Sequence, residues 1–190
     1  MNAAAADKTD RSGKALDALT EKYGEDDNTR YIRICQLVAS GDIGTAEEVV
    51  SHFSNKASPF YLMAQEDIMT QKYGSAEALG ENLIDLYIQS SNDNPDWGYP
   101  AKHAGGLLFD RGEYDKAAYY LTRAMLYGTE EDPEVYYYLG AALCEQEHYE
   151  KGLPLLNRAY ELGADEALLC GIASYVERSG MGEKTDEKSE

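Results

Sequence analysis

Cysteine and histidine, the residue types that most often serve as nucleophiles and metal ligands, are scarce in this sequence. Three cysteines and three histidines are spread along 190 residues: Cys35, Cys144, Cys170, His52, His103 and His148. No two histidines have the spacing of metal ligands, so we predict no histidine-based metal site. An odd, widely spaced set of cysteines is not a disulfide framework, which indicates reduced thiols in a cytoplasmic setting. Each cysteine lies within an apolar helical stretch, so we interpret it as a small buried or groove-facing side chain and not as a nucleophile.

Motifs that would indicate an enzyme are missing from the sequence. It contains no glycine-rich phosphate loop, no nucleophile elbow and no HExxH. Neighbouring acids such as Glu47 and Glu48, or those at 130–132, fall at expected helix starts and turns. Acidic side chains there interact favourably with the helix dipole, which is sufficient reason for their presence. We therefore predict a protein that is not an enzyme and that needs no cofactor and no metal.

The charge of the chain narrows the class of partner. Against 35 Asp and Glu there are 17 Lys and Arg, which gives a formal net charge of −18. Binding to nucleic acid through its phosphates needs a basic surface, so we expect no nucleic-acid partner. No run of 18 apolar residues is present, so we expect no membrane span. Residues 1–20 lack the basic and then apolar pattern of a secretory signal, and we expect a cytoplasmic location.

The elements that position the remaining residues come from an internal repeat. Residues 113–128 and 148–163 align at an offset of 35, and each follows an apolar helical stretch, at 99–110 and at 134–146. The identical pairs are Tyr114/Tyr149, Lys116/Lys151, Leu121/Leu156, Arg123/Arg158, Ala124/Ala159 and Gly128/Gly163. Each unit is therefore predicted to be a helix, a tight turn and a second helix.

This pattern resembles the tetratricopeptide repeat (TPR), a 34-residue helical hairpin with the motif W-x2-L-G-x2-Y…A-x3-F…P. The best copy runs from 133 to 166, and its matching positions are Tyr136, Leu139, Gly140, Leu143, Gly152, Leu156 and Ala159. Small residues at Gly140, Gly152 and Ala159 would let the two helices approach closely, while the large residues fill the space between them.

The resemblance implies an all-α fold, an α-α superhelix or solenoid of about four TPR-like hairpins with a C-terminal capping helix. The expected repeat domain spans 27–179. It is divided into four repeats, at 27–56, 57–94, 98–132 and 133–166, and a cap at 167–179. The first unit is degenerate, because Arg33 stands where leucine is expected. The register of the unit at 57–94 is ambiguous. An acidic tail at 180–190 is expected to be disordered.

Both ends of the repeat domain carry a further expected helix. The cap, Glu166–Ser179, has an apolar face at helical spacing: Leu168, Leu169, Ile172, Ala173 and Val176. At the other end, residues 1–26 form an N-terminal tail in which Lys14–Tyr23 could be a short helix with Leu16, Leu19 and Tyr23 on one side. Three interpretations remain open for this segment: it caps the first repeat, it dimerises, or it is a mobile tail.

The resemblance also implies a concave groove, lined by the first helix of each hairpin, that holds a peptide or a partner's helix. The residues assigned to it are Tyr31, Cys35, Tyr61, Gln65, Tyr99, Lys102, His103, Phe109, Tyr137, Tyr138, Ala141 and Tyr175. Tyrosine is abundant, with 16 residues against 3 Phe, and tyrosine is favoured where one end of a side chain is apolar and the other wet. For Tyr99, Tyr137 and Tyr138, lining of the groove and packing between helices both remain open.

Several classes of function fit these features. The leading hypothesis is a non-catalytic protein–protein interaction scaffold that binds an apolar, or a basic and aromatic, segment of a partner protein. A lysine, asparagine and arginine clamp for an acidic chaperone tail is not expected, because only Lys102 matches it in 98–166. A small acidic secretion-type chaperone with an apolar client is the first alternative. A self-associating scaffold, in which exposed Tyr119 and Tyr120 or the segment 14–23 drive assembly, is the second. We expect a monomer or a weak homodimer.

Overall fold

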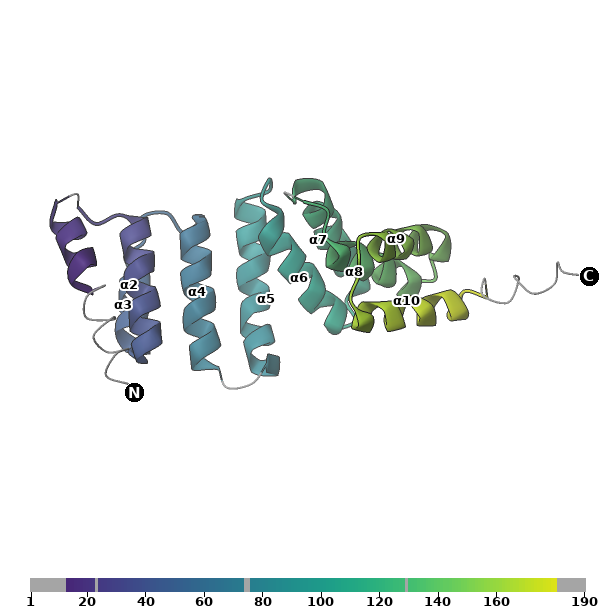
Figure 1. The fold of residues 1–190 in the computed structure, drawn as a ribbon, viewed down its shortest axis with the longest axis horizontal. Helices are drawn as coiled ribbons and strands as arrows, with labels where there is room; N and C mark the ends of the chain where they lie inside the picture. Colours follow the sequence, from purple (N-terminus) through teal and green to yellow (C-terminus); the bar gives the residue numbers. More distant parts are fainter. Residues whose placement is uncertain (1–12, 23, 74–75, 129, 181–190) are drawn as a thin grey trace, which may run out of the picture. The chain divides into compact units, whose positions relative to one another are not determined.

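The computed structural model describes residues 13–22, 24–73, 76–128 and 130–180, and every regular element within these ranges is an α-helix (Figure 1). A helix over 13–22 comes first. It is followed by α2 (Asp27–Ser40), α3 (Ile43–Ser51), α4 (Pro59–Lys72), α5 (Ala76–Asp93), α6 (Gly98–Asp110), α7 (Tyr114–Tyr127), α8 (Pro133–Glu145), α9 (Tyr149–Glu161) and α10 (Glu166–Arg178). The expected all-α fold of successive hairpins is confirmed. Across the described residues, no helix combines the length and the apolar character that a membrane span requires.

The chain divides into two compact units, and the boundary between Leu86 and Tyr87 lies inside α5. The first unit holds α2, α3 and α4, and the second holds α6 to α10. The repeat boundaries expected from the sequence lie in the turns between hairpins, so a division within a helix was not anticipated.

In the first unit, α2 packs against both α3 and α4. The carboxylate of Asp26 caps α2 by accepting a hydrogen bond from the backbone of Thr29 at 2.8 Å, and Gly41 ends the helix with φ 82°. A left-handed residue at this position favours glycine, which has no Cβ to clash with the preceding turn. The core beneath these helices is apolar and consists of Ile34, Ala46, Val50, Phe53, Ala64 and Ile68.

The helix over 13–22 explains the charged residue at the leucine position of the first repeat. The guanidinium of Arg33 lies 3.0 Å from the carboxylate of Asp17, which belongs to that helix. Leu16 in the same helix is only 3% exposed, whereas Leu19 is 49% exposed. Of the predicted apolar side, Leu16 is thus buried and Leu19 is not, while Tyr23 lies outside the described residues. Arg33 departs from the repeat pattern because it pairs with the additional N-terminal helix.

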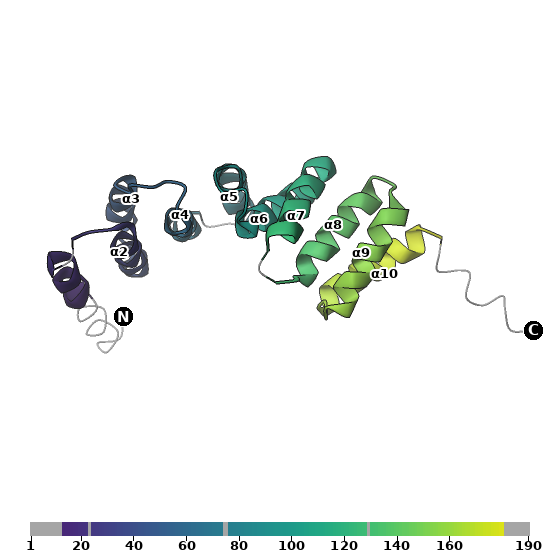
Figure 2. The same ribbon diagram turned by 90° about the horizontal axis from the view of Figure 1, so that it is seen from above.

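In the second unit, glycines permit the close approach that the repeat pattern predicted. A Cβ on Gly140 of α8 would lie 2.8 Å from the carbonyl oxygen of Gly152 on α9. A Cβ on Gly152 would lie 2.6 Å from the carbonyl oxygen of Gly140. These distances are shorter than van der Waals contact, so only glycine at both positions allows this separation of α8 and α9 (Figure 2).

The offset of 35 residues extends to the backbone of the turns. Gly112, between α6 and α7, donates to the carbonyl of Phe109 at 2.8 Å. Glu147, between α8 and α9, donates to the carbonyl of Cys144 at 3.0 Å, and these two residues lie 35 positions beyond their counterparts. Both donors have positive φ, 74° for Gly112 and 63° for Glu147. The second turn thus adopts the same geometry with a residue that is less suited to it.

The expected capping helix is α10, which packs against both α8 and α9. Its buried side differs from the predicted one. Leu169 and Ala173 are exposed, whereas Tyr175 is buried and Ile172 packs against the core of α8 and α9. The Tyr175 hydroxyl donates to the Glu145 carboxylate at 2.8 Å, which fixes the rotation of α10 about its axis. The predicted tail at 180–190 lies, apart from Gly180, outside the described residues.

Candidate functional site

Two of the three cysteine thiols, those of Cys35 and Cys144, lack the properties of nucleophiles. Cys35 is partly buried, and burial raises the pKa of its thiol. Cys144 is fully buried between helices, and burial raises its pKa as well. Because the thiolate is the reactive form, both thiols are less reactive than a free cysteine. In the described part of the chain, no group of three or more His, Cys, Asp or Glu residues is arranged to hold a metal ion.

In the first unit, the predicted groove residues gather where α2 and α4 meet. The rings of Tyr31 and Phe60 lie 5.8 Å apart, and the Cys35 thiol donates to Asp67 at 3.7 Å. Gln65 donates to the hydroxyl of Tyr61 at 2.9 Å. All four predicted residues, Tyr31, Cys35, Tyr61 and Gln65, are partly buried. They interact mainly with neighbouring helices, which leaves only part of each side chain for a ligand.

In the second unit, an aromatic row runs along the start of α6. The ring centroids of Trp97 and Tyr99 lie 5.6 Å apart, and those of Tyr99 and His103 lie 4.4 Å apart. The ring of His103 in turn stacks on that of Tyr87 in α5, with the centroids 5.0 Å apart. Tyr87 is buried, whereas Tyr99 is 41% exposed. Burial, followed by the neighbouring charge of Lys102, lowers the pKa of His103, so its imidazole is neutral near pH 7. The row therefore presents a rigid, uncharged aromatic surface with a buried anchor.

A second aromatic contact joins the end of α6 to α8. The rings of Phe109 and Tyr138 meet edge to face at 5.3 Å, and Tyr138 contacts Tyr137 in the same way at 5.2 Å. Phe109 and Tyr138 are partly exposed. Together with Tyr99 and His103 they place four of the predicted residues on the first helices α6 and α8. We call these four residues the aromatic surface.

Other predicted groove residues are not available to a ligand. Ala141 is 0% exposed and Tyr175 is 7% exposed, so placing them on an open groove was wrong. Both belong to the core where α10 packs against α8 and α9. Tyr137 lies against α10 as well, since a Cβ on Gly171 would overlap its hydroxyl group. Of the two tyrosines expected to be exposed on α7, Tyr119 is exposed and Tyr120 is buried, so the prediction for Tyr120 was wrong.

Lys102 is held by acidic side chains. Its ammonium lies 2.6 Å from the carboxylate of Asp132 and 2.6 Å from that of Glu134. Burial alone would lower the pKa of Lys102, but the hydrogen bonds that its ammonium donates to these two carboxylates raise the pKa above its usual value. The lysine thus remains charged and already has anionic partners, which leaves it poorly placed to bind a carboxylate of another protein.

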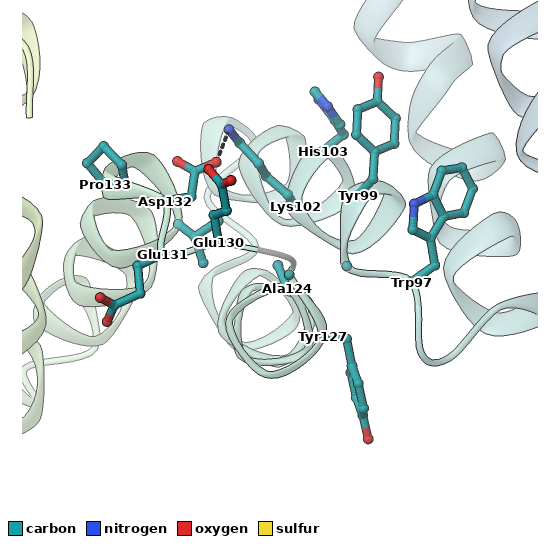
Figure 3. Close-up of a pocket in the computed structure, with 13 residues that line it drawn as sticks. Trp97, Tyr99, Lys102, His103, Ala124, Tyr127, Glu130, Glu131, Asp132 and Pro133 are labelled. Carbon is teal, nitrogen blue, oxygen red and sulfur yellow. Dashed lines mark hydrogen bonds and ion pairs between the residues drawn. The ribbon is translucent and has the colours of Figure 1, made fainter. Parts of the chain in front are cut away.

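A pocket of about 450 Å³ opens beside this ion pair. Its walls come from the start of α6, the end of α7 and the start of α8. Gly98 makes this junction possible, because a Cβ there would lie 2.7 Å from the backbone nitrogen of Gly128. Figure 3 shows the rings of Trp97 and Tyr99 on one side of the pocket and Lys102 with Asp132 on the other. The volume lies in the range of small-molecule and side-chain binding sites.

Comparison with solved structures identifies the fold. The chain matches the crystal structure of TTC0263, a thermophilic TPR protein in Thermus thermophilus, with a TM-score of 0.51 and 16% sequence identity. The match covers 90% of this chain and 92% of the other. The fold is that of a TPR protein. No family model matches the sequence, and no curated protein matches it.

The TPR pattern did not reveal the pocket. Trp97, Tyr127 and Glu130 line it, yet the sequence assigned none of them to a site. They lie outside the first-helix positions that TPR proteins are expected to use. One signal was present, because Trp97 is the only tryptophan of the chain and stands two residues before Tyr99.

Proposed function

We propose that this chain is a non-catalytic protein–protein interaction module, and that its aromatic surface on α6 and α8 binds a peptide or a helix of a partner protein. The observation that supports this most is the exposure of Tyr99, 41%, above an anchored stack of rings. An exposed aromatic side chain that is already held in place loses little conformational entropy on binding. Aromatic residues are also enriched at the centres of protein interfaces.

The setting of the proposed module is cytoplasmic. The cysteines of the described residues are free thiols, which suits a reducing compartment. The net charge of −18 favours partners that carry basic residues and disfavours acidic tails. We propose a monomer or a weak homodimer, and light scattering over a concentration series distinguishes the two.

The test compares two variants with the same loss of two tyrosines. The first carries Tyr99→Ala and Tyr138→Ala, on the first helices α6 and α8. The control carries Tyr119→Ala and Tyr160→Ala, which remove tyrosines that are 58% and 62% exposed on the second helices α7 and α9. Both variants are required to unfold cooperatively before they are used.

Affinity capture from the source lysate is then compared between these variants and the unmodified protein. We expect one partner to be captured by the unmodified protein and by the control, and to be lost with the first variant. If both variants retain the partner equally, the aromatic surface is not the binding surface. If only the control loses it, the second helices carry the interaction.

A further inference from the structure

We propose that the pocket between α6, α7 and α8 binds the guanidinium group of an arginine side chain from the partner. The inference rests on the proposed function, because the pocket adjoins Tyr99 and His103 of the aromatic surface. It specifies the chemistry of the partner segment, which has to be basic.

The aromatic wall of the pocket has the shape that a planar cation needs. The planes of the Trp97 and Tyr99 rings differ by only 17°, and the ring centroids lie 5.6 Å apart. Figure 3 shows the two rings next to each other, so they form one flat wall. Trp97 is partly exposed and Tyr99 is exposed, so their faces are accessible from the pocket. A guanidinium stacks on such faces through cation–π attraction, and tryptophan is the strongest partner for it.

The opposite wall is acidic. Glu130, Glu131 and Asp132 line the pocket, against one cation, Lys102. The carboxylate of Glu131 forms an ion pair with the guanidinium of Arg158, and the carboxylate of Asp132 forms one with the ammonium of Lys102. Within the described part of the chain, Glu130 is in no salt bridge, and Figure 3 shows it beside Asp132. Its carboxylate is therefore available to a guanidinium, which binds carboxylates with two parallel hydrogen bonds.

An anionic ligand is disfavoured by the same groups. The only cationic side chain of the lining is Lys102, and it already lies 2.6 Å from each of two carboxylates. His103 adds no positive charge near pH 7, because burial lowers its pKa. The pocket thus offers a flat aromatic face and a net negative charge, the combination that suits arginine better than an acidic or a purely aliphatic side chain.

The pocket contains its own reporter, because Trp97 is the only tryptophan of the chain. Tryptophan fluorescence of the full chain is measured during titration with acetyl-arginine amide. Acetyl-norleucine amide serves as the neutral aliphatic probe, and acetyl-glutamate amide serves as the acidic one. We expect a saturable change in emission with the arginine probe that neither of the others reproduces. No saturable change with the arginine probe, or a tighter response to either other probe, overturns the proposal.

Two variants with the same change of charge locate the site. Glu130→Gln removes the carboxylate in the pocket, and Glu150→Gln removes an exposed carboxylate on α9 that is not part of the lining. We expect Glu130→Gln to weaken binding of the arginine probe about two- to fivefold, as for one exposed ion pair, and Glu150→Gln to leave it unchanged. Equal weakening by both variants would mean that the probe responds only to overall charge and would overturn the proposal.

This experiment uses no partner protein, so its outcome is separate from the test of the proposed function. If partner capture depends on Tyr99 and Tyr138 but the arginine probe does not bind, the module functions without this pocket. If the probe binds but capture does not depend on those tyrosines, the pocket is a cation site and the aromatic surface is not the interface.

Discussion

Replacing glycine with alanine is expected to have opposite effects on stability at two positions of the second unit, Gly152 in α9 and Gly106 in α6. Gly152→Ala places a Cβ 2.5 Å from the sulfur of Cys144 and 2.6 Å from the carbonyl oxygen of Gly140. The carbonyl belongs to the backbone of α8 and cannot rotate away, so the helices have to separate. Gly106→Ala, in α6, places a Cβ where no heavy atom lies within 4 Å.

The magnitudes follow from two opposing contributions. Forcing an additional methyl group into a packed interior costs about 1–3 kcal/mol. Alanine is favoured over glycine inside a helix by about 1 kcal/mol. Because the backbone carbonyl of Gly140 cannot move aside, the upper part of the first range applies to Gly152→Ala, about 2–3 kcal/mol. We therefore expect Gly152→Ala to lower the free energy of unfolding by about 1–2 kcal/mol, and Gly106→Ala to raise it by up to about 1 kcal/mol.

Equilibrium unfolding in urea, followed by far-ultraviolet circular dichroism, measures both effects. Gly106 and Gly152 lie in the same compact unit, so the transition of that unit reports on both variants. The slope of the free energy against urea has to stay constant for the comparison to hold. If Gly152→Ala is as stable as the unmodified protein, α8 and α9 do not approach as closely as the structure places them, and the reasoning from the two glycines is refuted.

Three further predictions concern a turn, a histidine and the two ends of the chain. Glu147→Gly is expected to raise stability by up to about 1 kcal/mol in the same urea assay, because glycine adopts φ 63° without the clash of a Cβ; an unchanged midpoint would contradict this. His103 has a lowered pKa in the folded protein, so unfolding takes up a proton and stability is lost as the pH falls below about 6.5. His103→Gln is expected to reduce the loss between pH 7.5 and 5.5, and an identical loss in both proteins would argue against it. Removal of 167–190 is expected to lower the melting temperature more than removal of 1–13, because α10 covers the core of α8 and α9; equal melting temperatures would count against this.

The sequence was a sufficient guide where packing is local. Gly140 and Gly152 were expected to bring two helices together, and the structure has their backbones in contact. The prediction succeeded because the close approach occurs within one hairpin, where helical spacing alone decides which residues face each other. The tight turn between the two helices was predicted for the same reason.

The assignment of the groove was less successful, because it depends on contacts between distant segments. Ala141 occupies an inward position of its helix, but α10 covers the core to which it belongs. The pocket escaped prediction for a related reason. Trp97 directly precedes α6, Tyr127 ends α7 and Glu130 lies in the connection between α7 and α8. No periodic pattern marks residues that meet only where helices begin and end.

The offset of 35 residues has a consequence for how such a chain can change its length. The α6–α7 and α8–α9 turns have equivalent hydrogen bonds. In the same way, α10 packs against both helices of the hairpin before it, α8 and α9, as α8 packs against α6 and α7. A duplicated block of 35 residues would therefore meet surfaces that already fit it, whereas the gain or loss of one residue within a hairpin would rotate each later side chain by about 100°. Between α6 and α10, changes in chain length are therefore expected in whole units of 35 residues, and single-residue changes are expected in the connections between hairpins.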